Sequence, residues 1–391
     1  MELVGNIKNY EWGKLGQSSE VAKLAKANNG KFSVNEEAPY AELWMGTHCS
    51  GPSLLKSSGT ELGQVYDEPL PFLLKVLSIR KALSLQVHPN KDEAKHLHKE
   101  RPDIYKDPNH KPELAIALTP FKALCGFRPY EEIHQFCQEL PPLKELLGGD
   151  AVIKKLSNGA AGDLKKCYQA LMSAEPAAVS ACIDKIAEEY MEVLEKFNLS
   201  DTFTTINADF PDDVGVLSLF FINLIHLQPG ESIYLGANEI HAYLSGDCIE
   251  CMACSDNVIR AGLTPKYKDV QQLLTSLNYN GSPAATRLFQ PKVIDANAKV
   301  FAPPVKDFAV VNVTLPSSQT TTYSLELPQG PGILLVSQGS RKLLLKEHSE
   351  LVLKSGSIIF IPPECMGNIE FSCIDGASDD FTAYLATENT F

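Results

Sequence analysis

Gln86 and His88 lie two residues apart in the segment A-L-S-L-Q-V-H-P-N-K, residues 82–91. Side chains alternate along a strand, so a strand over this segment would have one apolar face and one polar face. The polar face would carry Ser84 together with the amide and the imidazole. An amide oxygen and an imidazole suit a cation such as zinc when a carboxylate and a second imidazole join them. The alternative is an interior histidine satisfied by hydrogen bonds.

Glu113 and His241 are the residues that could complete such a site. Glu113 follows Pro112 and opens the apolar run E-L-A-I-A-L. A carboxylate in an apolar strand is costly to bury unless it is paired or binds a metal. An ion pair with a nearby lysine, such as Lys111, is the alternative. His241 begins a strand-like run after a Gly-Ala-Asn turn, and the four side chains would form a nitrogen and oxygen site with room for water or a substrate oxygen.

Two cations stand out near these residues. Arg260 follows Asp256 by four positions in S-D-N-V-I-R-A-G-L-T-P-K. A guanidinium near a metal can stabilise an oxyanion or hold a phosphate, although an Asp–Arg structural pair is equally consistent with the local sequence. Lys75 lies in the apolar run F-L-L-K-V-L-S-I. Such a lysine either extends to the surface or faces a polar cavity, and the nearby Ser84 favours the cavity.

Three cysteines with C-x2-C-x2-C spacing, Cys248, Cys251 and Cys254, are the competing candidate for a metal site. A zinc or iron–sulfur site usually needs a fourth thiolate or a histidine at suitable spacing. The other cysteines nearest in sequence are Cys182 and Cys365, far from this motif. We therefore interpret the three thiols as small buried residues of a strand.

The elements that must position these residues are mostly strands. Residues 1–127 contain short apolar runs bounded by Pro or Gly, which indicate strands. Residues 128–213 show apolar side chains at three- and four-residue spacing, which predicts a block of helices. The β pattern returns at Val214. The overall pattern is mainly β.

A partial repeat suggests that the chain contains two β-barrels of one kind. The segment P-G-E-S-I-Y-L-G-A-N-E-I-H, residues 229–241, is echoed by S-G-S-I-I-F-I-P-P-E-C-M-G, residues 355–367. His241 aligns with Gly367, and residues 290–391 contain a single histidine, His348. The second barrel is therefore expected to be catalytically silent.

Composition limits the classes of partner. The chain has 391 residues and a net charge of −13, which disfavours nucleic-acid binding. An anionic substrate would need a local cluster of Lys and Arg. The sequence shows no secretory signal pattern and no apolar run of about 18 residues, so we expect a cytoplasmic protein without a membrane span. The ten scattered cysteines are expected to be reduced thiols.

Several motifs together resemble the type I mannose-6-phosphate isomerases, also called phosphomannose isomerases. They are Y-E-W-G, A-E-L-W-M-G-T-H-C-S-G-P-S, F-L-L-K-V-L-S-I-R-K-A-L-S-L-Q-V-H-P-N-K, H-K-P-E-L-A-I-A-L and E-I-H-A-Y-L-S-G-D-C-I-E-C-M-A-C-S-D-N-V-I-R-A-G-L-T-P-K. The similarity covers essentially the whole chain. It implies a zinc-dependent aldose–ketose isomerase, an intramolecular oxidoreductase that interconverts mannose 6-phosphate and fructose 6-phosphate. The reaction would supply mannose 6-phosphate for the synthesis of GDP-mannose and for glycosylation.

The resemblance also implies a fold of two cupin-type β-barrels (jelly rolls) with an inserted α-helical domain. The first cupin would comprise residues 1–127 and 214–289 and carry the catalytic site. Residues 128–213 would be the helical insert, and residues 290–391 the non-catalytic cupin.

The family pattern assigns site residues by position. One Zn²⁺ would be held by Gln86, His88, Glu113 and His241. The catalytic arginine matches Arg260, and the less certain catalytic candidates are Lys111 and Asp256. The substrate-binding candidates are Lys75, Ser84 and the tryptophan of Tyr10-Glu11-Trp12-Gly13. The partner is a small sugar phosphate, and the protein is expected to be a monomer.

Two rival functions follow from the same fold. One is a cupin without metal that only binds sugar or protein. The other is an iron-dependent cupin dioxygenase, against which an amide ligand counts.

Overall fold

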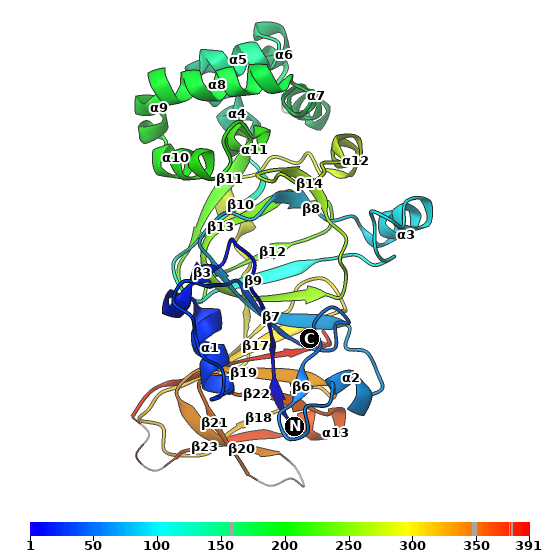
Figure 1. Cartoon of the computed structure of the whole chain (residues 1–391), viewed down its shortest axis with the longest axis vertical. Helices are drawn as coiled ribbons and strands as arrows, with labels where there is room; N and C mark the ends of the chain where they lie inside the picture. Colours follow the sequence, from blue (N-terminus) through cyan, green and yellow to red (C-terminus); the bar gives the residue numbers. More distant parts are fainter. Residues whose placement is uncertain (157–159, 346–349, 375, 377) are drawn as a thin grey trace.

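The computed structural model describes residues 1–391 except 157–159, 346–349, 375 and 377. In Figure 1, helices gather at one end, a large antiparallel sheet occupies the middle, and the C-terminal strands form the other end. The described residues are thus mainly β with antiparallel pairing, and they include no helix long and apolar enough to cross a membrane.

The middle of the molecule is a ten-stranded sheet. Its main order is β11-β10-β13-β7-β5-β2, with β8, β9, β12 and β14 attached off this path. The strands are β2 (Asn6–Lys8), β5 (Glu42–Met45), β7 (Phe72–Ile79), β8 (Leu85–Val87), β9 (Glu113–Ala117), β10 (Phe121–Phe127), β11 (Ile222–Leu227), β12 (Ser232–Leu235), β13 (His241–Ala253) and β14 (Ile259–Gly262).

Strand β13 organises this sheet because it has different partners along its length. Its first residues pair with β10, and the stretch from Gly246 onward pairs with β7 and β9. Gly246 has φ +114°, a conformation that residues with a Cβ rarely adopt. A Cβ here would lie 2.7 Å from the Pro120 carbonyl oxygen. Gly246 therefore marks the point where β13 changes partners.

The residues between β10 and β11 form the helices that the apolar spacing predicts. The described ones are α4 (Tyr130–Glu139), α5 (Pro141–Leu146), α6 (Asp150–Leu156), α7 (Ala161–Met172), α8 (Pro176–Glu189), α9 (Met191–Lys196), α10 (Ser200–Asp209) and α11 (Val214–Leu217). In α8 the buried residues Val179, Cys182, Ile183 and Ile186 recur every three or four positions. They join a core that also takes in Leu85, Val87 and Ala261 from the sheet.

The C-terminal strands form an eight-stranded sheet in the order β15-β16-β17-β24-β19-β22-β1-β6 and a four-stranded sheet in the order β18-β23-β20-β21. They are β15 (Lys292–Val293), β16 (Ala298–Phe301), β17 (Ala309–Leu315), β18 (Tyr323–Leu325), β19 (Gly332–Gln338), β20 (Ser340–Leu345), β21 (Leu351–Lys354), β22 (Ile358–Ile361), β23 (Ile369–Ser372) and β24 (Phe381–Thr387). Two strands come from the start of the sequence, β1 (Glu2–Val4) and β6 (Leu54–Leu55).

The remaining elements are short. They are β3 (Lys14–Leu15), β4 (Pro39–Tyr40), α1 (Glu20–Asn28), α2 (Leu62–Val65), α3 (Lys91–Glu100), α12 (Val270–Ser276), α13 (Pro363–Met366) and three 3₁₀ turns, Gly16–Ser18, Ser218–Phe220 and Ala284–Arg287.

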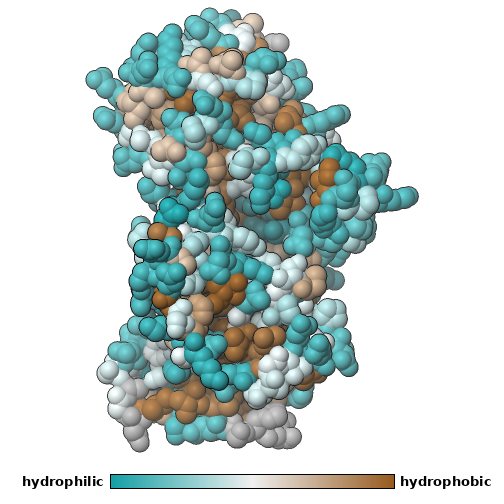
Figure 2. Space-filling view, viewed as in Figure 1, coloured by the Kyte–Doolittle hydropathy of each residue, from teal (hydrophilic) through white to brown (hydrophobic). Residues whose placement is uncertain are grey.

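One hydrophobic core is shared by the middle sheet and the C-terminal sheet. It combines Leu43, Leu74 and Ile249 from the middle sheet with Ile333 and Phe360 from the C-terminal sheet. On the face shown in Figure 2, hydrophilic side chains interrupt the apolar ones along the whole molecule. Beneath this surface, the apolar side chains of the two sheets contribute to a common interior.

The partial repeat in the sequence has a structural counterpart. Gly230 and Gly356 both have positive φ, +86° and +84°. Each is followed two residues later by a four-residue strand, β12 or β22. His348, the single histidine of the second predicted barrel, lies outside the described residues.

Candidate metal centre

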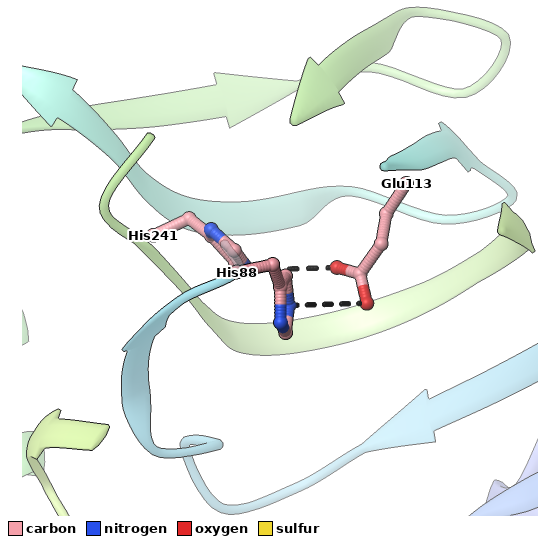
Figure 3. A group of neighbouring side chains, drawn as sticks. All are labelled: His88, Glu113 and His241. Carbon is pink, nitrogen blue, oxygen red and sulfur yellow. Dashed lines mark ion pairs between the residues drawn. The ribbon is translucent and has the colours of Figure 1, made fainter. Parts of the chain in front are cut away.

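His88, Glu113 and His241 come together as a buried trio (Figure 3). Their nearest ligand atoms all lie within 4.8 Å of one another. His88 Nε2 is 3.4 Å from one oxygen of Glu113, and His241 Nε2 is 3.4 Å from the other. Each of the three residues is at most 2% exposed. Three of the four metal ligands expected from the sequence therefore converge on one point.

Backbone carbonyls fix the tautomer of both histidines. His88 Nδ1 lies 2.7 Å from the Asn257 carbonyl oxygen, and His241 Nδ1 lies 2.8 Å from that of Glu239. A carbonyl only accepts, so each Nδ1 donates a proton. Both Nε2 atoms are buried and have no hydrogen-bond partner among the described residues. Each Nε2 lone pair is therefore directed toward the space beside the Glu113 carboxylate. Zinc-binding histidines usually donate one ring N–H to a carbonyl in this way and keep the other nitrogen for the metal.

The protonation states also fit a cation. Burial lowers the pKa of His88 to about 4, despite the opposing effect of the Glu113 carboxylate. Burial would raise the pKa of Glu113, but His88 and Lys111 outweigh it and hold this pKa well below its usual range. Neutral imidazole and ionised carboxylate are the forms that ligate zinc, so the donor set fits this metal.

Strand register brings the trio together. His241 opens β13 and is directly opposite Gln86 of β8. Glu113 opens β9, where it is opposite Met252 near the other end of β13 and also opposite Leu235 of β12. Leu235 precedes His241 by six positions, so the pairing with β12 places Glu113 near His241. The predicted strand over 82–88 is shorter than expected, because β8 comprises only residues 85–87 and His88 follows its end. Gln86 lines the adjoining cavity, and its role as fourth ligand stays a prediction.

A cavity of about 590 Å³ adjoins the trio through Glu113. Most of the other site residues expected from the sequence line it: Trp12, Lys75, Ser84, Gln86, Lys111 and Arg260. The Lys111 ammonium is 3.5 Å from the Glu113 carboxylate. The helical block contributes Phe210, whose ring lies under the Lys81 ammonium at 4.7 Å.

Arg260 projects into this cavity without a carboxylate partner among the described residues. It lies on β14 opposite Gln86, and burial lowers the pKa of its guanidinium. Asp256 does not pair with it. The Asp256 carboxylate is instead 3.6 Å from His48 Nε2, and Asp256 is absent from the described residues that line the cavity. The structural Asp–Arg pair considered above is thus not formed.

Lys75 faces the cavity, but its charge is already matched. Its ammonium lies 3.0 Å from Glu250 and 3.6 Å from Glu42. Burial would lower the pKa of Lys75, but these carboxylates outweigh it and raise the pKa. Glu42 also accepts a hydrogen bond from the Trp44 indole. Sequence reasoning missed both glutamates, although Glu250, inside the apolar run C-I-E-C-M, carried the same signal that singled out Lys75.

The three cysteines of the C-x2-C-x2-C motif do not assemble a metal site. Cys248 and Cys251 are buried on β13 in two different apolar clusters. Cys254 follows the strand, and its thiol approaches the Leu70 carbonyl oxygen at 3.5 Å. Among the described residues, the His, Cys, Asp and Glu side chains grouped closely enough for a metal are those of His88, Glu113 and His241.

Comparison with known proteins identifies the family. The family model described as phosphomannose isomerase type I, catalytic domain, matches residues 1–130. The chain is 39% identical over 388 residues to the mannose-6-phosphate isomerase of Mus musculus, with 91% of each chain covered. It is 38% identical over 386 residues to that of Schizosaccharomyces pombe, covering 91% of this chain and 93% of the relative.

Solved structures agree. A variant of phosphomannose isomerase from Salmonella typhimurium superimposes with a TM-score of 0.82 at 30% identity, covering 99% of both chains. A zinc-bound mannose 6-phosphate isomerase gives 0.80 at 30% identity with the same coverage. Fold and site are thus those of a mainly β isomerase with a candidate zinc centre. The chain belongs to the type I mannose-6-phosphate isomerase family, which confirms the resemblance seen in its motifs.

Proposed function

We propose that this protein interconverts mannose 6-phosphate and fructose 6-phosphate in a zinc-dependent reaction through a cis-enediol. The observation that carries the proposal is the pair of buried, unpartnered Nε2 atoms facing Glu113 beside a cavity lined by cations. Family membership supplies the reaction class.

One Zn²⁺ per chain would be held by Gln86, His88, Glu113 and His241. When bound, the ion would act as a Lewis acid toward the oxygens on carbons 1 and 2 of the sugar. Histidines that donate Nδ1–H to carbonyls keep their rings oriented for this role.

The chain's own groups account for the proton transfer. A proton leaves carbon 2 of open-chain mannose 6-phosphate and is returned to carbon 1, and the hydroxyl proton on O2 passes to O1, while negative charge develops on these two oxygens. Lys111 is our candidate for the group that moves this proton, because it lines the cavity beside Glu113. Arg260 would stabilise the enediolate, because its charge is unmatched by any described carboxylate. Asp256, proposed from the sequence, would have to act from beside His48.

The phosphate needs a cationic partner within an overall acidic protein. The described lining includes five cations, Lys75, Lys81, Lys111, Arg260 and Lys266, and four carboxylates, Glu11, Glu42, Glu113 and Glu250. Lys75 with Ser84 was the first candidate from the sequence. Lys81 and Lys266 are structural alternatives, because neither forms an ion pair with a described residue. Trp12, stacked on Tyr10 with ring centroids 5.9 Å apart, would border the sugar.

The wider assignments are proposals on the same basis. We propose a catalytic cupin (1–127 and 214–289), a helical insert (128–213) and a silent cupin (290–391). The strand ladders describe open sheets, so closure into barrels rests on side-chain packing and family membership. We further propose a monomer in the cytoplasm that supplies mannose 6-phosphate for GDP-mannose and glycosylation.

The test combines metal analysis with turnover of mannose 6-phosphate. The purified protein should contain one zinc and convert the substrate. His241→Ala should lose both, while His226→Ala, which removes an exposed imidazole on β11, should lose neither. Absence of metal together with sugar binding would favour a binding cupin. Iron with oxygen consumption would favour a dioxygenase. Either result would refute the isomerase.

A further inference from the structure

Two loops meet behind the metal centre through the Asp107 carboxylate. One of its oxygens accepts from the backbone N–H of Asp256 at 2.7 Å. The other accepts from the backbone N–H of Asn109 at 2.9 Å and lies 2.8 Å from Ser255 Oγ. Asp107 thus holds the loop that leaves β13 against its own loop, which leads to β9.

Asn257 extends this connection and is completely buried. Its side-chain amide donates to the carbonyl oxygens of Asp107 at 2.6 Å and Asn109 at 2.9 Å. Its own carbonyl oxygen is the acceptor for His88 Nδ1. The group that orients His88 is therefore fixed by the loop that Asp107 organises.

The same loop also delivers the carboxylate of the trio. Glu113 lies six residues after Asp107, and the carbonyl oxygen of Pro112, just before it, accepts from Ala253 N at 3.2 Å. One side chain thus connects the two loops on which the positions of His88 and Glu113 depend.

We propose that Asp107 is a positioning residue for the metal centre, acting through Asn257 on His88 and through its own loop on Glu113. The inference rests on the zinc site proposed above, but it is independent of the reaction performed there. Groups that hold metal-ligating histidines typically contribute 10–100-fold to metal affinity. Asp107 is two contacts away from the ligand His88, through Asn257, so we expect its loss to act by misplacing ligands that are themselves unchanged.

The test measures zinc affinity in the full chain by competition with a chromophoric chelator. Asp107→Ala should weaken zinc binding about 10–100-fold. Asp107→Asn keeps one acceptor oxygen but presents an amide NH₂ toward other donors. Its loss of zinc affinity should therefore be smaller than that of Asp107→Ala. The visible absorption of the cobalt-substituted protein should shift in both variants, because it reports ligand geometry at the metal.

Asp295 provides a matched control. Its carboxylate also accepts two backbone N–H groups, from Asn297 and Ala298, and a hydroxyl, that of Tyr323, but in the C-terminal part. Asp295→Ala should change stability without changing zinc affinity or the cobalt spectrum.

Three results would overturn the proposal. One is a folded Asp107→Ala protein with unchanged zinc affinity and cobalt spectrum. Another, if that variant fails to fold, is an Asp107→Asn protein with both properties unchanged. The last is an equal loss of zinc affinity in the Asp295→Ala control. A wild-type protein that binds zinc through His88 but does not turn over mannose 6-phosphate would refute only the proposed reaction. Loss of affinity in the Asp107 variants would still support this inference.

Discussion

Arg260 and Lys75 line the same cavity, but the charged groups around them differ. The Arg260 guanidinium has no carboxylate partner among the described residues, whereas Lys75 lies between two buried glutamates. A cation whose charge is unmatched is free to respond to negative charge that appears during a reaction. A cation between two carboxylates is mainly committed to neutralising them.

Replacing Arg260 by Ala should reduce turnover about 10²–10³-fold, as the loss of one preorganised donor to an oxyanion typically does. Arg260→Lys keeps the charge but loses the planar pair of donors, so it should also be poor. Steady-state kinetics measures the effect, because loss of transition-state stabilisation lowers kcat. A higher KM at normal kcat would instead assign Arg260 to ground-state binding of the phosphate.

Replacing Lys75 by Met should destabilise the protein by about 3–5 kcal/mol, because two buried carboxylates would lose their shared cation. Urea unfolding measures this. Lys56→Met is the control, since the Lys56–Glu2 pair is 40% and 46% exposed and such pairs contribute about 0–1 kcal/mol. Normal stability with a large rise in KM would show that Lys75 serves the phosphate more than the glutamates.

The sequence allowed the chemistry of single residues to be predicted better than their partners. Gln86, His88, Glu113 and His241 stood out because polar groups are rare on apolar strands. The carbonyls of Asn257 and Glu239 that orient the histidines could not be found this way, because any residue carries a carbonyl. Their role depends only on where the backbone passes.

At the scale of elements, β13 connects the parts of the middle sheet. Gly246 allows this, and Gly246→Ala should therefore destabilise the fold by about 1–3 kcal/mol through backbone strain. The close approach to the Pro120 carbonyl would add to this cost. Gly367→Ala is the control, because Gly367 has a right-handed helical φ and open space around it. Equal unfolding midpoints for the two variants would contradict this interpretation of β13.

Elements defined by local periodicity were predicted well. The spacing of apolar residues over 128–213 predicted helices, and in α8 the residues at this spacing form the buried face. The division between α8 and α9 at Tyr190 was not predicted. The strand over 82–88 was predicted too long, because residues 82–84 precede the ladder and His88 follows its end, directly before Pro89. The placement of β1 in the C-terminal sheet was not predictable, since its partner β22 lies hundreds of positions away, and β6 joins this sheet through β1.

At the scale of the whole molecule, the shared core makes the C-terminal region dependent on the rest. A fragment of residues 290–391 would lack β1 and β6 and would expose Phe360 and Ile333. We expect it to unfold without a cooperative transition, unlike the full chain. Thermal unfolding followed by circular dichroism measures this. A sharp transition and dispersed NMR signals in the fragment would show that this region folds independently.

The pairing of Glu2 with Ile359 also has a consequence during synthesis. A ribosome adds about 5–20 residues per second, so roughly 20–70 s separate the appearance of these two residues. During that interval most of the middle sheet can form, while β1 has no partner beyond the two residues of β6. A strand made before most of the middle sheet is therefore incorporated after it. For this interval its backbone N–H and C=O groups are open to chaperones or to pairing with neighbouring nascent chains.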